Sequence, residues 1–352
     1  MVRLHRMVLT FRYRVKNAGN LPALARLVNT VWNYCGDVQE QARRWARRWA
    51  TGFDLIQLTR ASRELGLHSD SIAAVCLQFA RSRDHFKRRP RWRKSVGKKR
   101  SLGWIPFNAA RAIRMNGAAI IFHKQRYRLW LHRPIEGKIL TGCFAEDARG
   151  RWYLNLQCAV EETLPTGNGE VGIDLGLAPL ATLSDGATID RERVTARYAA
   201  QLATAQRAGR IQRVRAIQAK ITNVRKDFLH RASNAITSKY ERIVVGNVNA
   251  AALARTRLSK SVYDASWSAF RTMLAYKAMR HRAQYVEADE RWTTQRCSDC
   301  GAIGGPKGIA ALGVREWVCV GCGVVHDRDI NAARNLLSGR NVGLQLTESP
   351  VL

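Results

Sequence analysis

The chain has 352 residues, of which 46% are hydrophobic, enough for the cores of two or three domains. Its 59 lysines and arginines against 27 aspartates and glutamates give a formal net charge of +32 and a sequence pI near 10.9. The charge is not confined to tails, because residues 1–165 carry +21 (32 basic, 11 acidic) and the remainder +11 (27 basic, 16 acidic). A basic-tailed ribosomal or chromatin protein is therefore disfavoured, and a folded protein that binds a polyanion is expected.

Membrane and secreted classes are also disfavoured. No segment approaches the roughly 20 consecutive apolar residues of a membrane span. The first fifteen residues, MVRLHRMVLTFRYRV, alternate basic and apolar side chains, which predicts a strand rather than a signal peptide. We expect a cytoplasmic protein whose scattered cysteines are small core residues: Cys35, Cys76, Cys143 and Cys158.

The first half of the chain predicts a strand, several helices and a basic segment. Residues 8–16 are typical of a strand, and residues 21–50 of a helix. Residues 55–81 predict one or two more helices, with Ser69 or Asp70 as an N-cap. Residues 103–165 are rich in strand patterns and indicate a β-hairpin or small barrel.

The basic segment spans residues 81–100 and holds eleven lysines and arginines with one acid. These cations repel one another unless a polyanion neutralises them, so phosphate contacts are favoured over a merely solvated face. Phe86 and Trp92 within the segment either stack on bases or belong to a local core. The expected nucleic-acid contacts here are Arg81, Arg83, Lys87, Arg88, Arg89, Arg91, Arg93, Lys94, Lys98, Lys99 and Arg100.

From residue 171 onward, strands alternate with helices, which predicts an α/β sheet after a linker at residues 166–170. The predicted strands are residues 171–175, 180–184, 242–245 and 284–288. The predicted helices are residues 189–235, 266–281 and 329–337.

Two C-x-x-C pairs, Cys297/Cys300 and Cys319/Cys322, are separated by eighteen residues, and a glycine follows each pair. Each pair can present two thiolates from one turn, so the four sulfurs predict a closed tetrahedral Zn²⁺ site with a structural role. Four unrelated core cysteines and an iron–sulfur cluster are the less favoured alternatives.

Acidic residues in two other motifs suggest a second metal site. Asp174 lies within the apolar strand Gly-Ile-Asp-Leu-Gly, where a lone buried carboxylate needs a cation or a partner. Asp327 and Asp329 open the helix in His-Asp-Arg-Asp-Ile-Asn-Ala-Ala, where either could also serve as its N-cap. Hard oxygen ligands of this kind suit Mg²⁺ or Mn²⁺, and two such ions can support phosphodiester cleavage.

These motifs in this order resemble the C-terminal half of TnpB, an insertion-sequence family related to type V CRISPR effectors. The resemblance covers about residues 166–340 and implies an RNase H-like (RuvC) α/β domain with an inserted zinc ribbon. The earlier part matches only in general character, as a β wedge domain with an inserted helical lobe. The implied fold is α+β and multidomain, with a wedge at 1–30 and 104–165, a basic recognition lobe at 31–103, a nuclease domain at 166–296 and 323–340, a ribbon at 297–322 and a tail at 341–352.

The resemblance assigns roles residue by residue. Asp174 and Asp329 match the first and last catalytic aspartates, and the four clustered cysteines match the zinc ligands. The family's middle motif, an apolar strand ending in Glu-Asp-Leu-Asn, corresponds here to residues 243–249. Gly246 stands where the catalytic glutamate is expected, and glycine has no side chain to bind a metal.

The following strand, residues 284–288, supplies a replacement hypothesis. It ends in Asp289-Glu290, and in an RNase H-like sheet it lies beside the strand that carries Gly246. Some relatives, including the eukaryotic Fanzor proteins, resemble this arrangement, with the glutamate displaced to just before the segment leading to the first cysteine. We therefore predict Glu290 as the third Mg²⁺ ligand, with Glu287 and Asp289 as second choices and an ordinary surface acid as the alternative.

The resemblance implies an RNA-guided DNA endonuclease of a prokaryotic cytoplasm, associated with the nucleoid. Its cofactors are structural Zn²⁺ and catalytic Mg²⁺ or Mn²⁺, its partners are a guide RNA and double-stranded target DNA, and it is either a monomer or a dimer. Two other readings are a non-cleaving RNA-guided repressor and a guide-independent transposon DNA-binding protein. Further expected nucleic-acid contacts are Lys226, His230, Arg231, Thr293, Thr294 and Arg328, with turn capping as the alternative for the two threonines.

Overall fold

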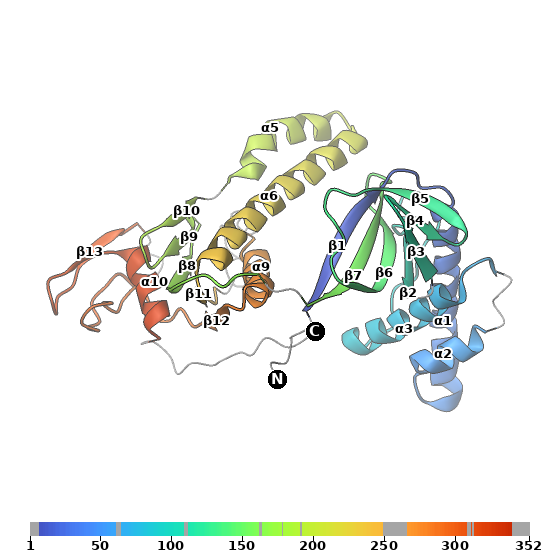
Figure 1. Ribbon diagram of the computed structural model, residues 1–352, viewed down its shortest axis with the longest axis horizontal. Helices are drawn as coiled ribbons and strands as arrows, with labels where there is room; N and C mark the ends of the chain where they lie inside the picture. Colours follow the sequence, from blue (N-terminus) through green and yellow to red (C-terminus); the bar gives the residue numbers. More distant parts are fainter. Residues whose placement is uncertain are drawn as a thin grey trace. The chain divides into compact units, whose positions relative to one another are not determined.

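The computed structural model in Figure 1 describes residues 7–60, 65–108, 112–161, 164–177, 179–190, 192–248, 266–307, 311 and 313–339. The chain forms two compact units, residues 1–161 and 162–352. Their boundary falls just before the linker predicted at residues 166–170. Both units combine helices with a sheet, so the chain is an α+β protein of more than one domain. The predicted tail at 341–352 and Asn249 lie outside the described residues.

The first unit is built on an antiparallel sheet with the strand order β2-β6-β7-β1-β5-β4-β3. Along β1, Phe11, Tyr13 and Val15 are buried and the residues between them are exposed, the alternation of a strand with one face on a core. The strand predicted at residues 8–16 and the strand-rich region at 103–165 are confirmed. The strands are β1 (Met7–Val15), β2 (Trp104–Asn108), β3 (Ile113–Asn116), β4 (Ala119–Phe122), β5 (Gln125–Trp130), β6 (Lys138–Glu146) and β7 (Trp152–Val160).

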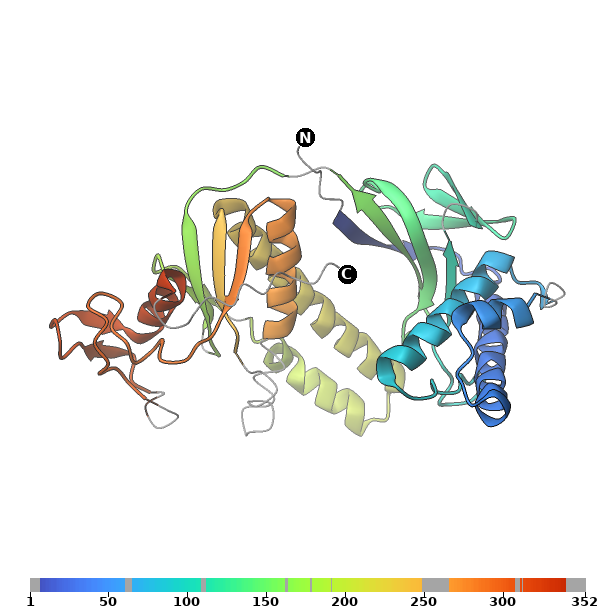
Figure 2. The ribbon, with the colours of Figure 1, turned by 90° about the horizontal axis from the view of Figure 1, so that it is seen from below.

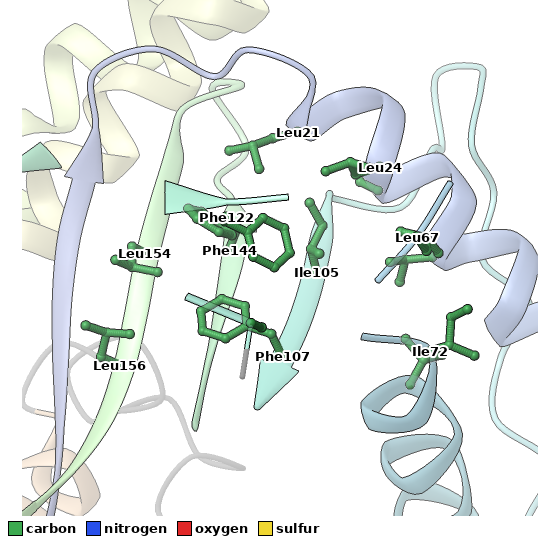
Figure 3. Packing of buried hydrophobic residues seen from close by; sticks show 14 of the residues in the cluster. Leu21, Leu24, Leu67, Ile72, Ile105, Phe107, Phe122, Phe144, Leu154 and Leu156 are labelled. Carbon is green, nitrogen blue, oxygen red and sulfur yellow. The ribbon is translucent and has the colours of Figure 1, made fainter. Parts of the chain in front are cut away.

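Helices α1 (Leu21–Ala46), α2 (Gly52–Leu58) and α3 (Ser69–Phe86) share one hydrophobic core with this sheet. Helix α1 is shorter than predicted, because Arg47 turns left-handed with a φ of 51°. The predicted N-cap of α3 is wrong: His68 is the cap, and its ring nitrogen Nδ1 accepts a hydrogen bond from the backbone of Asp70. Figure 3 shows part of the core, labelled at Leu21, Leu24, Leu67, Ile72, Ile105, Phe107, Phe122, Phe144, Leu154 and Leu156.

The second unit contains the predicted α/β sheet, with the strand order β10-β9-β8-β11-β12. Strands β8, β11 and β12 run parallel, and β9 and β10 are antiparallel additions at one edge. The strands predicted from residue 171 onward are confirmed within one or two residues. Their bounds are β8 (Glu170–Leu175), β9 (Pro179–Leu183), β10 (Thr188–Asp190), β11 (Arg242–Gly246) and β12 (Gln284–Ala288).

Helices α6 (Ile211–Lys239) and α9 (Trp267–Arg280) cover one face of this sheet, and α10 (Arg328–Ser338) covers the other (Figure 2). Ile243 and Val245 of β11 belong to the cluster with α6 and α9, whereas Val244 packs with Leu336 of α10. The single helix predicted over residues 189–235 is wrong in two places. Its first residues belong to β10, and the rest is divided between α5 (Val194–Arg207) and α6 by a turn in which Gly209 has a φ of 62°.

Helix α10 lies directly against β8. A Cβ atom placed on Gly172 would be 1.9 Å from the carbonyl oxygen of Ala333, so only glycine permits this approach. A short hairpin is formed by β13 (Glu316–Val318) and β14 (Val325–Asp327), and the turn between its strands carries Cys319 and Cys322. Strand β14 leads directly into α10. Among the described residues, no helix combines the length and the apolar character that crossing a membrane requires.

Candidate active site and metal centre

Asp174 lies at the edge of the sheet where three parallel strands end. Ile173 pairs with Val245, so the next residues, Asp174 and Gly246, lie level on neighbouring strands. Gly246 in turn pairs with Ala288, the last residue of β12. The chain that follows β12 therefore begins at the same edge as Asp174, the edge at which open α/β sheets usually place their sites.

Glu290 fills the space beside Gly246. A Cβ atom built on Gly246 would lie 2.1 Å from Glu290 Oε1, 2.7 Å from Cγ and 2.8 Å from Cδ, which is closer than two such atoms can approach. The glutamate side chain thus occupies the position that a side chain of residue 246 would take. Glu290 therefore reaches the place beside Gly246 that the displaced-glutamate hypothesis requires. Metal binding by Glu290 stays a prediction.

The neighbouring acids are engaged elsewhere. Glu287 pairs with Arg271 at 3.2 Å and accepts a hydrogen bond from the Tyr285 hydroxyl at 2.9 Å. Asp289 accepts the backbone N–H of Arg291 at 3.0 Å. Oε1 of Glu290, by contrast, is buried without a hydrogen-bond partner. A buried carboxylate oxygen in that state is costly, which makes Glu290 the best candidate of the three for a cation ligand.

Asp329 reaches the same edge from α10. Asp327 caps the helix by accepting the backbone N–H groups of Asp329 and Ile330, so the capping alternative applies to Asp327. Asp329 precedes Ala333 by one helical turn, and Ala333 touches Gly172, two residues before Asp174 on the same strand. The close approach of α10 to β8 therefore carries Asp329 toward Asp174. Its carboxylate accepts a hydrogen bond from Arg315 at 2.8 Å.

Burial and neighbouring carboxylates raise the pKa values of Asp174 and Glu290. Burial, and next the charge of Asp329, raise the pKa of Asp174 to about 7. Burial, and next the charge of Asp174, raise the pKa of Glu290 to about 8. Like charges gathered at a desolvated edge are the usual preparation of a cation or proton-transfer site.

The carboxylates are gathered but not tightly clustered. Among the described residues, the two groups of three or more ligand atoms that lie within 4.8 Å of one another are both at the cysteines. Asp174, Glu290 and Asp329 do not form such a group.

The four predicted zinc ligands do come together. Cys297 Sγ lies 3.7 Å from Cys322 Sγ, and Cys300 Sγ lies 3.5 Å from Cys319 Sγ. The backbone N–H of Cys322 lowers the pKa of the Cys319 thiol to about 7, which favours the thiolate that binds metal. This donor set fits Zn²⁺ in a closed, structural site.

His326 is a member of this centre that the sequence analysis missed. Its ring is 3% exposed, Nε2 lies 3.0 Å from Cys297 Sγ, and the ring packs against Trp317 with centroids 4.9 Å apart. With its proton on Nε2 the ring donates to the Cys297 thiolate, as outer groups around metal ligands often do. The spacing Cys322-x-x-x-His326 was the available signal, since histidines at such spacings often accompany zinc cysteines.

Replacing His326 by alanine is expected to weaken zinc binding by about 10–100-fold, the usual effect of losing an outer hydrogen bond to a ligand. Glutamine, which keeps an N–H donor, should lose less. Competition with a zinc chelator measures the affinity, and Cys319→Ser serves as the variant that loses the ion altogether. Equal zinc affinity in wild type and His326→Ala would contradict this role.

The basic segment contains two arginines with structural contacts, Arg83 and Arg93, and a larger set of exposed cations. Arg83 is 6% exposed and donates to the carbonyl of Ala50 at 2.5 Å. Arg93 donates to Asn29 at 2.7 Å and lies over the rings of Trp32 and Trp104, and burial lowers its pKa. These two arginines hold the helical part together, so their expected phosphate contacts receive no support.

The other cations of the segment face solvent. Arg89 pairs with Asp37 and Glu40, and Arg100 with Glu146. Phe86 and Trp92 are 57% and 56% exposed, which leaves them available for stacking and outside the local core. The remaining exposed cations are Arg81, Lys87, Arg88, Arg91, Lys94, Lys98 and Lys99.

The threonines before the cysteines serve the turn. Thr293 is 2% exposed and donates its hydroxyl to the carbonyl of Glu290 at 2.9 Å. Thr294 donates to the carbonyl of Pro306 at 3.3 Å. Both contacts correspond to the turn-capping alternative rather than to phosphate binding.

The remaining predicted contacts lie in different settings. On α6, Lys226 is exposed, Arg231 pairs with Asp227 at 3.1 Å, and His230 is half-buried beside the Tyr276 hydroxyl. Arg328 donates to the carbonyl of Ala311, and its charge lowers the pKa of Asp174 against the larger effect of burial. Arg328 thus lies close to the carboxylate edge.

Two family models match consecutive parts of the chain. The family model described as "Probable transposase" (OrfB_IS605) matches residues 155–257, and the model "Cas12f1-like, TNB domain" matches residues 267–336. The first match contains Asp174 and Gly246. The second contains Glu290, the four cysteines and Asp329.

Individual relatives agree with these models. A Streptomyces pristinaespiralis protein named as a candidate RNA-guided DNA endonuclease is 36% identical over 216 residues, 56% of this chain and 52% of that protein. InsQ of Escherichia coli, with the same description, is 28% identical over 246 residues, 61% of this chain and 60% of its own length. A TnpB-like protein of Acanthamoeba polyphaga mimivirus is 29% identical over 133 residues, 36% of this chain and 24% of its own. The matches span between a quarter and three-fifths of these relatives' lengths, so the chain is similar to TnpB-like proteins and to proteins described as RNA-guided DNA endonucleases over part of their sequences.

Proposed function

We propose that this chain is an RNA-guided DNA endonuclease that hydrolyses target DNA beside a short adjacent motif. The observation that carries the proposal is the position of Glu290. Its side chain fills the space beside Gly246, and one of its carboxylate oxygens is buried without a hydrogen-bond partner. Burial and the nearby charge of Asp174 raise its pKa. An inactive site would have no use for three acids brought to one sheet edge from three elements. The names of the relatives support the same activity.

The residues at this edge fit Mg²⁺ or Mn²⁺. Asp174, Glu290 and Asp329 offer hard oxygen ligands, and the raised pKa values of Asp174 and Glu290 mark a deficit of positive charge there. When bound, two such ions stabilise the attacking and leaving oxygens of the phosphodiester. Arg271, which pairs with Glu287, favours the ionised form of Glu290, and Arg328 favours the ionised form of Asp174.

We propose further that the second unit is a RuvC-type nuclease domain, residues 166–296 and 323–340, with a zinc ribbon at 297–322. The first unit would comprise the wedge, residues 1–30 and 104–165, and the recognition lobe at 31–103. The exposed cations of the basic segment would hold the backbone of the guide RNA, while base pairing reads the target DNA. A protein acting on DNA in this way would work in the cytoplasm beside the nucleoid.

A non-cleaving, RNA-guided DNA-binding protein is the second candidate, because Gly246 removes the carboxylate that the family usually places on this strand. Its repression of transcription would need only guide and target binding. The position of Glu290 favours the enzyme over this alternative. A guide-independent transposon DNA-binding protein is a third reading, which a co-purifying RNA would exclude.

Plasmid cleavage by the purified ribonucleoprotein tests the proposal. With Mg²⁺, wild type and the matched control Asp190→Ala, an exposed acid of the same sheet, should cut a plasmid carrying the target. Asp174→Ala, and wild type without added Mg²⁺, should bind the target and leave it intact. Guide-dependent binding without cutting by wild type would establish the repressor reading instead.

The raised pKa values predict a pH-dependent stability in metal-free protein. The folded values, about 7 for Asp174 and about 8 for Glu290, exceed the ordinary 3.8 and 4.5, so the folded state binds more protons and loses stability as pH rises across that interval. Glu290→Gln should therefore match wild type near pH 5 and exceed its Tm near pH 8, by a few degrees if the difference is about 1 kcal/mol. Thermal melts without added Mg²⁺ at both pH values measure this, and added Mg²⁺ should narrow the gap in Tm at pH 8. An identical pH profile for the two proteins would argue against the electrostatic coupling.

A further inference from the structure

Two buried asparagines of α10 hold the segment that connects Glu290 to Cys297. Asn331 Nδ2 donates to the carbonyls of Thr293 at 3.0 Å and Arg296 at 2.8 Å. Asn335 Nδ2, one turn later, donates to the same two carbonyls at 2.9 and 2.6 Å. Asn331 Oδ1 also accepts the backbone N–H of Ser298 at 2.8 Å. The turn is therefore bonded to the helix at three points of its backbone.

These bonds continue to Glu290. The backbone N–H and the hydroxyl of Thr293 both donate to the carbonyl of Glu290, at 3.3 and 2.9 Å. Asn331 is two residues from Asp329 on the same helix, so the turn that Asn331 binds is attached to the element that carries Asp329. Asn331 is 1% exposed and Asn335 0% exposed, so water cannot replace either set of bonds.

A displaced glutamate needs such a connection. A carboxylate that projects from a strand inherits its position from the sheet, as Asp174 does. Glu290 instead lies two residues beyond the end of β12, where its carboxylate accepts the backbone N–H of Val248 and the rest of its turn is bonded to α10. The bond to Val248 holds the carboxylate to the sheet, and the asparagines hold the backbone of the turn to the helix that carries Asp329.

We propose that Asn331 and Asn335 are positioning residues that set the place of Glu290 relative to Asp329, and so determine the affinity of the site for its divalent cations. The inference rests on the function proposed above and deepens it. Both asparagines are buried and act through the turn, and neither is proposed as a ligand of the cation. Their replacement should weaken Mg²⁺ binding while zinc and target DNA remain bound.

The test measures divalent-cation binding in the ribonucleoprotein. Electron paramagnetic resonance counts bound Mn²⁺, and subtraction of the Asp174→Ala signal removes the ions held by RNA. Asn331→Ala is expected to weaken the remaining binding by about 10-fold or more, the range seen when outer-shell partners of metal ligands are lost. The Mg²⁺ concentration for half-maximal cleavage should rise by a similar factor. Asn335→Ala, which removes only the duplicated pair of bonds, is the milder variant if Asn331→Ala folds poorly, and it should show a smaller shift in the same direction.

Thr237→Ala is the matched control, because Thr237 is also a fully buried polar side chain of this unit, bonded to the carbonyl of Ser233. It should lower Tm without changing Mn²⁺ affinity. Asparagine variants that lose Tm as Thr237→Ala does, with wild-type Mn²⁺ affinity, would overturn the inference. If in that case Glu290→Ala still weakens Mn²⁺ binding, only the positioning role of the asparagines is refuted. If Glu290→Ala also binds Mn²⁺ as wild type does, the assignment of Glu290 as a ligand is refuted, and the inference with it.

Discussion

Replacing Glu290 by alanine is expected to lower the rate of target cleavage by about 10²–10⁴-fold, because a lost ion ligand removes several kcal/mol of transition-state stabilisation and about 1.4 kcal/mol corresponds to each factor of ten. Guide-dependent target binding should stay within about twofold, since binding depends on phosphate contacts and base pairing elsewhere. Single-turnover cleavage and filter binding with the same ribonucleoprotein separate the two quantities. Glu290→Gln should lose activity as Glu290→Ala does. Its amide keeps the size of the side chain but lacks the negative charge.

The matched control is Asp289→Asn, the adjacent acid, whose carboxylate accepts a backbone N–H that an amide oxygen can still accept. It should cleave at nearly the wild-type rate. Glu287→Gln is less clean, because it also leaves Arg271 without its ion pair. Normal cleavage by Glu290→Ala together with a large loss in Asp289→Asn would transfer the role to the neighbouring acid.

Local sequence patterns were sufficient to predict most strands, and the resemblance to TnpB supplied the acids expected at the sheet edge. Period-two burial in β1 and the apolar runs of β8, β11 and β12 are short-range signals. Parallel pairing of β11 with β8 and β12 then dictates that Asp174, Gly246 and the residues after Ala288 meet. Glu290 was inferred from a missing side chain at Gly246, and the structure supplies the contact that the inference required.

Contacts between distant side chains could not be predicted in this way. Arg83 and Arg93 belong to a cationic run in the sequence, yet each is bonded to backbone or side-chain oxygens that only tertiary packing brings near. Asn331 looked like part of a helix-opening motif, and its three bonded partners are more than thirty residues away. His68 was overlooked as a cap because serine and aspartate follow it, and both are the more usual capping residues.

Replacing Gly246 by alanine is expected to slow cleavage nearly as much as removing Glu290. The new methyl group would lie 2.1–2.8 Å from three atoms of the Glu290 side chain, so that side chain must leave its place. The backbone of Gly246 lies in an ordinary strand without a positive φ, so alanine itself fits and Tm should change little. Gly313→Ala is the control, because a Cβ atom there meets nothing within 4 Å.

If the methyl group acts only by displacing Glu290, the two substitutions are not additive. Gly246→Ala in a Glu290→Ala background should cost no further activity, whereas independent effects would multiply. A multiplied loss would show that Gly246 serves the site in some other way.

A double substitution can move the glutamate carboxylate from the turn after β12 back to β11. In Gly246→Glu alone, the new side chain and Glu290 compete for one space, so activity should be low. In Gly246→Glu with Glu290→Ala, the space is free and a glutamate projects from the position that the family usually gives it. We expect this double variant to cleave at least about 10-fold faster than either single variant, since one well-placed ligand is worth more than about 1.4 kcal/mol. Recovery would mean that the two positions supply one carboxylate to one site. A double variant no better than Glu290→Ala would mean that the site needs the glutamate to arrive from the turn that Asn331 holds.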